Sequence, residues 1–317
     1  MSQDMPHFEA ARLTVRLAAI VANYRTYRRM TGPTAVAAVV KADGYGLGAE
    51  RIAPALAEAG CDCFFVARLE EGVALRKKIP RARIVVLDGA QPDAVPALIS
   101  HHLTPALNSL AEIAAWSAAA GVGRGALDAV LHVDTGMNRL GLAGEELAIL
   151  SGEHARRLAG LNLVLVMSHL ACADEPANPK NGEQLSRFRQ ALAMLPPAPA
   201  SLAASHGAML GLDYHFDLVR PGVALYGANP QANEGKGGSA PNLMQTACVL
   251  SARVLQLRRI DSGESVGYAA TFRAKRPTML ATVALGYADG LPRTLSNRGV
   301  AVLGACACPS WAGCRWT

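Results

Sequence analysis

The chain has few aromatic residues and little charge. Aromatic side chains make up 5% of its 317 residues and charged ones 18%, whereas hydrophobic residues reach 51%. This composition describes a soluble globular protein with a large core. Alanine supplies much of the apolar content, as it does in helix-rich α/β proteins.

Signals of several other protein classes are absent. No apolar run is long enough to span a bilayer, and residues 1–10 lack the apolar region of a signal peptide. We therefore expect a cytoplasmic protein with no membrane partner. The formal net charge is +6, but its lysines and arginines are scattered and not interleaved with aromatic residues. This distribution argues against nucleic-acid binding.

Cysteine use does not indicate a metal site. Of the 7 cysteines, Cys306, Cys308 and Cys314 crowd the end of the chain. Their spacing matches no zinc pattern and no histidine completes the set, so we expect no metal ion.

Short β-branched runs alternate with helical patterns from about residue 12 to 227. The expected strands are 35–41, 63–67, 83–88, 104–107, 129–133, 163–169, 200–205 and 223–227. The expected helices include 49–59, 69–77, 109–120, 145–157 and 183–195. Eight strand–helix steps predict an α/β fold, a (β/α)8 TIM-type barrel, which we assign to residues 1–230.

The pattern changes after residue 227. A linker rich in Asn, Gly and Pro is followed by strands with no helices between them, at 247–257, 265–270, 278–285 and 299–303. These strands predict an incomplete all-β domain over residues 240–317.

The segment AVVKADGYGLG (residues 38–48) carries the clearest chemical signal. A buried strand ends in Lys41, and a glycine-rich turn follows at once. A lysine there can lose its proton readily, as a Schiff-base nucleophile must. A lone lysine would more simply extend to solvent, but Asp134, His169 and Arg220 also fall near strand ends, where barrel enzymes have their active sites.

Further motifs occur in a fixed order along the chain. They are DTGMNRLG (134–141), MSHL (167–170), RPGVALYG (220–227), VGYAAT (266–271) and GYADGLPR (286–293). With the segment around Lys41, the ordered set resembles the alanine racemase family, pyridoxal-phosphate enzymes of fold type III. The resemblance implies a cytoplasmic homodimer that converts L-alanine to D-alanine on a pyridoxal 5'-phosphate aldimine, for cell-wall synthesis or alanine catabolism.

The resemblance also assigns catalytic roles. Lys41 would form the Schiff base and act as one of two bases, and Tyr268 from the partner subunit would be the other. Tyrosine titrates near ~10, so it needs nearby tuning groups, here His169 and then Arg220. Arg220 would face the pyridine nitrogen and, being always charged, keep it unprotonated. Arg139 would contact the cofactor's phenolic oxygen and the substrate carboxylate.

Other residues are assigned to binding by the same resemblance. Tyr45, Ser205, Gly222 and Val223 match contacts to the cofactor phosphate, where small residues let backbone N–H groups approach the anion. Tyr287 resembles a tyrosine that lines the substrate's path.

The chain departs from the family pattern at three places. His132 stands where the family often has a lysine whose carbamylated side chain steadies the following arginine. Ala204 stands where an asparagine commonly precedes the phosphate-binding serine. Residues 304–317 resemble an out-of-frame reading of the family's continuation, so we expect a C-terminally truncated racemase.

Three alternatives are considered. A broader-specificity amino-acid racemase shares every motif above. A non-catalytic cofactor carrier would lack both the DTGMNRLG segment and the domain that holds Tyr268. An inactive, truncated racemase that retains cofactor binding fits the altered C-terminal end.

Overall fold

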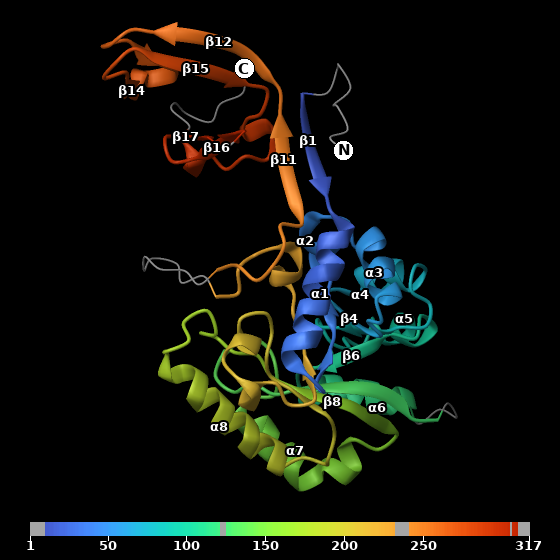
Figure 1. The fold of residues 1–317 in the computed structure, drawn as a ribbon. Helices are drawn as coiled ribbons and strands as arrows, with labels where there is room; N and C mark the ends of the chain where they lie inside the picture. The colour runs from blue at the N-terminus through green and yellow to red at the C-terminus, as the bar shows by residue number, and fades with distance from the viewer. Residues whose placement is uncertain (1–9, 121–124, 232–240, 305, 310–317) are drawn as a thin grey trace. The chain divides into compact units, whose positions relative to one another are not determined.

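The computed structural model describes residues 10–120, 125–231, 241–304 and 306–309 (Figure 1). The chain forms two compact units. One, the barrel unit, comprises Val15–Ala247, and the other, the C-terminal unit, comprises Met1–Thr14 with Cys248–Thr317.

Parallel strands form the framework of the barrel unit. A seven-stranded sheet runs in the order β3-β4-β5-β6-β7-β8-β9. Its strands are β3 (Ala38–Val39), β4 (Cys63–Val66), β5 (Arg83–Val86), β6 (Thr104–Leu107), β7 (Leu127–His132), β8 (Leu161–Met167) and β9 (Ala200–Ser201). All neighbouring pairs in it are parallel.

An eighth strand closes the ring. β10 (Leu218–Val219) pairs in parallel with β2 (Ala35–Val36), which precedes β3. On one side of β10, the Ala37 N–H donates to the Val219 carbonyl at 2.9 Å. On its other side, the Arg220 N–H donates to the carbonyl of Ala203 at 2.9 Å. The expected (β/α)8 barrel is therefore confirmed.

The expected position of the eighth strand, 223–227, is wrong. Val223–Tyr226 forms a 3-10 helix, η3, directly after β10. Pro221 lacks an N–H for a sheet ladder, and the Leu225 N–H turns back to the Gly222 carbonyl at 2.8 Å. The apolar run at 223–227 is buried by this turn and not by a strand.

Helices surround the barrel strands (Figure 1). They are α1 (Leu17–Thr31), α3 (Ala49–Glu58), α4 (Leu69–Arg76), α5 (Val95–Ser100), α6 (Leu110–Ala120), α7 (Gly144–Arg157) and α8 (Pro179–Ala193). The large core lies between these helices and the outer faces of the strands. The last helix begins earlier than expected because Asn178 caps it, its side chain accepting from the Lys180 N–H at 3.0 Å.

A second, smaller core fills the inside of the ring. Its members are alternate residues of the strands, which is the period-2 pattern of side chains that share one face. They are Ala37, Val39, Cys63, Phe65, Val85, Ala106, Val130, Leu165 and Met167, with Leu218 packed against them. The next inward-facing position on each strand lies at the mouth of the barrel.

The C-terminal unit consists of two-stranded sheets. β1 (Ala11–Val15) pairs with β11 (Cys248–Ala252), β12 (Val254–Ile260) with β15 (Thr278–Val283), β13 (Ser265–Val266) with β14 (Phe272–Arg273), and β16 (Val300–Leu303) with β17 (Cys306–Pro309). The all-β class is confirmed.

Details of the C-terminal unit differ from the sequence-based expectation. The strand expected at 265–270 stops at Val266, because Gly267 has φ 72° and the 3-10 helix η4 (Tyr268–Ala270) follows. Residues 306–309 of the expected out-of-frame tail form β17, whereas 305 and 310–317 lie outside the described residues. Among the described residues, no helix is long and apolar enough to cross a membrane.

Candidate active site

A layer of polar residues lies inside the barrel at the carboxyl ends of its strands. Each stands two positions beyond a residue of the inner core, so its side chain points into the mouth of the barrel. They are Lys41 after Val39, Asn108 after Ala106, His132 after Val130, His169 after Met167 and Arg220 after Leu218.

Lys41 leaves β3 at an unusual turn. The next four residues, Ala42, Asp43, Gly44 and Tyr45, all have left-handed backbone angles, with φ between 52° and 63°. Such angles cost ~1–2 kcal/mol for each non-glycine residue. Backbone strain of this kind persists only where surrounding contacts enforce it.

Two carboxylates enforce the Lys41 turn. The Glu71 carboxylate accepts from the N–H groups of Ala42, at 2.6 Å, and Ala67, at 2.8 Å. Asp43 accepts from the Ala49 N–H at 2.8 Å and thereby joins the turn to α3. These contacts orient a half-buried Lys41 at the strand end.

Arg220 is the most buried cation of the mouth. Its side chain donates to the Ser201 hydroxyl and, at 2.6 Å, to the carbonyl oxygen of Ser168. Its guanidinium carbon lies 5.8 Å from the centre of the Phe65 ring. Burial lowers the pKa of Arg220 to about 10, so it keeps its charge at neutral pH.

The two histidines of the mouth are neutral. Burial, followed by the charges of Arg220 and Arg139, lowers the pKa of His169 to about 3 and that of His132 to about 4. Lys41 contributes to the shift at His169, so these groups share one electrostatic neighbourhood.

Asn108 was not identified from the sequence. Its Nδ2 donates to the carbonyls of Leu87 and Ala106 at 3.2 and 2.8 Å, which fixes the amide orientation. Its Oδ1 lies 2.8 Å from His132 Nδ1 and therefore accepts that proton, leaving a lone pair on His132 Nε2. The available signal was its place directly after the strand 104–107.

Ser205 and Gly222 form a small cradle beside Arg220. The Ser205 hydroxyl lies 2.9 Å from the Gly222 N and 3.3 Å from the Ala224 N, and accepts from both. A Cβ on Gly222 would lie 2.3 Å from the Tyr45 hydroxyl, so only glycine lets this backbone and that ring meet. Burial raises the pKa of Tyr45, whose ring packs against Tyr226 with centroids 4.8 Å apart.

A cavity of about 500 Å³ opens at this edge of the mouth. Its lining includes His169, Ala204, His206 and Val223. His169, which the sequence predicts as catalytic, and Val223, which it predicts as a cofactor contact, therefore border a space large enough for a small ligand.

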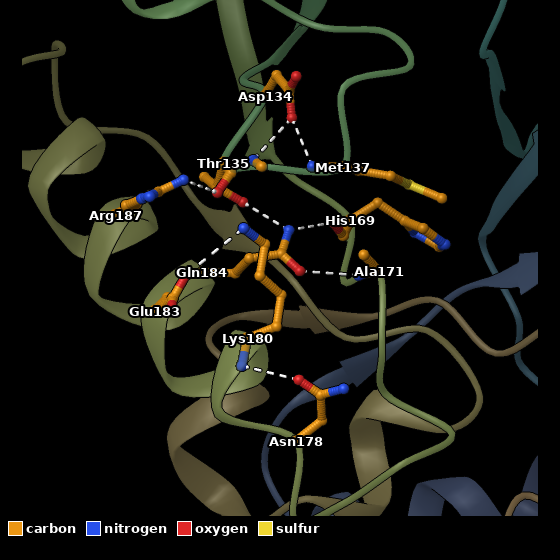
Figure 2. Close-up of polar contacts among 11 residues, drawn as sticks. Asp134, Thr135, Met137, His169, Ala171, Asn178, Lys180, Glu183, Gln184 and Arg187 are labelled. Atoms are coloured by element: carbon orange, nitrogen blue, oxygen red, sulfur yellow. Dashed lines mark hydrogen bonds and ion pairs between the residues drawn. The ribbon is translucent and has the colours of Figure 1, made fainter.

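Arg139 lies in the loop that carries DTGMNRLG. The Asp134 carboxylate accepts from the N–H groups of Gly136, Met137 and Asn138, at 2.8 to 3.1 Å, and folds the loop. Figure 2 shows the contact with Met137. Asp134 thus serves the turn, and Arg139 stands exposed within it.

Tyr268 and Tyr287 do not belong to the barrel unit that holds the residues described above. Both belong to the C-terminal unit, in the 3-10 helices η4 and η5 (Tyr287–Asp289). Their side chains are 63% and 49% exposed. The described barrel mouth is built from barrel-unit residues alone.

The barrel mouth fits a phosphate-bearing cofactor anchored by a lysine. Lys41 and Arg220 supply positive charge, and the Gly222 and Ala224 N–H groups converge on the Ser205 hydroxyl, beside a glycine where a Cβ would be excluded. A lysine at a strand end, a buried arginine and a tight backbone turn at the mouth of a parallel barrel fit the class of pyridoxal-phosphate barrel enzymes.

Comparison with known proteins narrows this class to one family. The family model for the alanine racemase N-terminal domain matches residues 15–230, and that for the C-terminal domain matches residues 247–311. The chain therefore belongs to the alanine racemase family.

Individual relatives agree with the family match. A catabolic alanine racemase of Agrobacterium fabrum is 48% identical over 290 residues, which are 91% of this chain and 73% of the relative. An alanine racemase of Rhizobium meliloti is 47% identical over 93% of this chain and 76% of its own length.

Solved structures of similar proteins share the fold. The Bartonella henselae alanine racemase with covalently bound pyridoxal phosphate has a TM-score of 0.84 and 42% identity, covering 92% of this chain and 80% of its own. A biosynthetic alanine racemase of Pseudomonas aeruginosa has a TM-score of 0.87 and 34% identity, covering 96% and 84%.

Proposed function

We propose that this chain interconverts L-alanine and D-alanine with pyridoxal phosphate bound through Lys41. The observation that carries the proposal is that Lys41, His169 and Arg220 lie together at the barrel mouth, in a chain of the alanine racemase family. When bound, the cofactor supplies an electron sink that makes the α-proton of alanine removable.

Different residues of the barrel mouth would bind different parts of the cofactor. Ser205, Gly222, Val223 and Tyr45 would hold the phosphate, as their hydrogen bonds and close packing favour. Arg220, held by Ser168 and Ser201, would face the pyridine nitrogen and keep it unprotonated because its own charge persists.

Proton transfer needs a base on each face of the α-carbon. Lys41 would serve one face, and Tyr268 of a second copy of the chain would serve the other. The 63% exposure of Tyr268 supports this, because a residue presented to another copy must be accessible on its own. Arg139 would bind the substrate carboxylate, and Tyr287 would line its path.

The proposal includes a homodimer in the cytoplasm. It covers both metabolic directions, because one relative is named catabolic and another biosynthetic. D-alanine produced here would serve cell-wall synthesis, and the reverse reaction would serve alanine breakdown.

The test is turnover of L-alanine by the purified 317-residue chain with pyridoxal phosphate added. We expect D-alanine to form, Lys41→Ala to abolish it, and Tyr268→Phe to lower kcat by about 100-fold or more. Lys78→Ala, a surface ion-pair lysine, is the matched control and should leave turnover unchanged. Lysine-linked cofactor in the absorption spectrum without any turnover would contradict the activity.

A further inference from the structure

The side chain of Gln184 on α8 joins two loops of the barrel mouth (Figure 2). It is fully buried although it belongs to a surface helix of the barrel. Its Nε2 donates to the Thr135 hydroxyl at 3.2 Å and to the His169 carbonyl at 2.9 Å. Its Oε1 accepts from the Ala171 N–H at 2.8 Å.

Each loop carries a residue of the proposed site. Thr135 belongs to the loop that continues to Arg139, and the His169 carbonyl belongs to the residue whose imidazole faces the mouth. All three polar contacts of Gln184 are therefore made with these two loops. A buried amide satisfied in this way holds its partners in one arrangement, because any lost contact leaves a buried polar group unpaired.

The contacts continue inward to Arg220. The hydroxyls of Thr135 and Ser168 lie 2.8 Å apart, and both side chains are buried. The carbonyl of Ser168 in turn accepts from the Arg220 guanidinium at 2.6 Å. Gln184, Thr135 and Ser168 thus form a continuous path from the outer helix to the buried arginine.

A second contact with α8 holds the same loop. Arg187 donates to the Thr135 carbonyl at 3.4 Å, and a Cβ on Gly136 would lie 3.0 Å from the Arg187 guanidinium. Gly136, with φ 127°, lets the loop backbone approach the helix closely. The loop that carries Arg139 is thereby packed on the helix that carries Gln184.

We propose that Gln184 is a positioning residue that couples the Arg139 loop to the His169 loop, so that both side chains keep one geometry at the barrel mouth. This inference rests on the proposed function for its kinetic consequence. Its structural part, the coupling of two loops, holds for the protein whether or not alanine is the substrate.

The decisive variant is Gln184→Met, which keeps the length of the side chain and removes its polar atoms. Gln190→Met is the matched control, because Gln190 is exposed on the same helix and its amide donates to the Ser186 hydroxyl one turn away, at 3.4 Å. We expect Gln184→Met to raise KM for alanine by about 2-fold to 30-fold, the range of a coupling carried through such a network. KM does not depend on the fraction of active enzyme, so a merely structural loss would leave it unchanged.

Amide hydrogen exchange tests the coupling independently of activity. In Gln184→Met, peptides covering 135–141 and 168–173 should both exchange faster than in the wild type and in Gln190→Met. Faster exchange at 168–173 alone would overturn the coupling, since it would reflect only the lost acceptor of Ala171.

A pair of variants at Thr135 covers the case in which Gln184→Met fails to fold. Thr135→Val removes the hydroxyl that joins Gln184 to Ser168, and Thr135→Ser keeps it. Thr135→Val should speed exchange at 168–173, and Thr135→Ser should restore it. Equal exchange in both variants would overturn the inference. A wild-type chain without turnover would contradict the proposed function while leaving this exchange test intact.

Discussion

At the barrel mouth, burial and neighbouring cations determine the charge state of the histidines. His132 donates from Nδ1 to Asn108 and lies near Arg139 and Arg220, and these cations and its burial keep it neutral. The family often has a lysine with an anionic group at this position, whereas His132 offers a neutral acceptor atom, Nε2, because its proton is on Nδ1. A hydrogen-bond acceptor is thus retained without a negative charge.

The buried histidine predicts a pH dependence of stability. The pKa of His132 falls from 6.5 unfolded to about 4 folded. Between pH 6.5 and 4, His132 binds a proton in the unfolded chain but not in the folded one. The free energy of unfolding should therefore fall as the pH drops through this range, and His132 should contribute up to about 3 kcal/mol of the fall. Urea unfolding at several pH values should show a smaller fall in His132→Gln. The exposed His154→Gln is the control, and an unchanged slope in His132→Gln would contradict the prediction.

Gly222 illustrates a residue whose lack of a side chain is needed. A Cβ there would lie 2.3 Å from the Tyr45 hydroxyl and 3.3 Å from Val39 Cβ. Gly222→Ala should displace Tyr45 and weaken pyridoxal-phosphate binding by about tenfold, in line with the cost of overpacking. Titration followed by absorption measures this affinity. Gly152→Ala, where a Cβ meets nothing within 4 Å, should bind the cofactor as the wild type does.

At the scale of elements, the turn after β3 depends on a neighbouring helix. The N-terminal end of α4 supplies Glu71, whose carboxylate accepts from Ala42, Ala67 and Arg68. The left-handed segment that begins at Ala42 is thereby tied to a regular helix. The position of Lys41 follows from two elements and not from the local sequence alone.

Removal of this carboxylate should loosen the Lys41 turn. Glu71→Ala leaves three backbone N–H groups without their acceptor, so the free energy of unfolding should fall by about 1–3 kcal/mol. Thermal and urea unfolding measure the loss. Its neighbour Glu70, in an exposed pair with Arg68 at 3.8 Å, provides the control, since Glu70→Ala should change stability little. Equal losses in the two variants would contradict the assigned role.

At the scale of the molecule, the two units differ in how they bury apolar residues. The barrel unit holds nearly all of the buried hydrophobic residues, whereas β16 in the C-terminal unit exposes Val300, Val302 and Leu303 at 65–72%. Strands with exposed apolar side chains favour association with other copies.

Exposed strand residues predict concentration-dependent association. The apparent mass measured by light scattering should increase as the protein concentration increases, and Val302→Lys should reduce this increase. Leu212→Lys is a matched control, because Leu212 is 77% exposed but belongs to the barrel unit outside any strand. The same mass increase in Val302→Lys would argue against β16 as the contact.

The sequence by itself determined the class of fold and the family. Period-2 and helical patterns are local, so they predicted the first seven barrel strands and most of the helices between them, although not α5. The order of motifs around Lys41, Arg139 and Arg220 predicted the family that the comparisons then confirmed. The roles assigned to Tyr268 and Tyr287 stay predictions.

Only the tertiary structure decided which residues meet. The ring closes through β10 and not through the apolar run at 223–227. β10 pairs with β2, whereas Pro221, which has no N–H to donate, ends the sheet pairing before that run begins. Asn108 and Gln184 gained their roles from partners distant in sequence, and His132 and His169 are neutral because of burial beside arginines. Burial, charge and hydrogen-bond partners depend on contacts between distant segments, which no local pattern encodes.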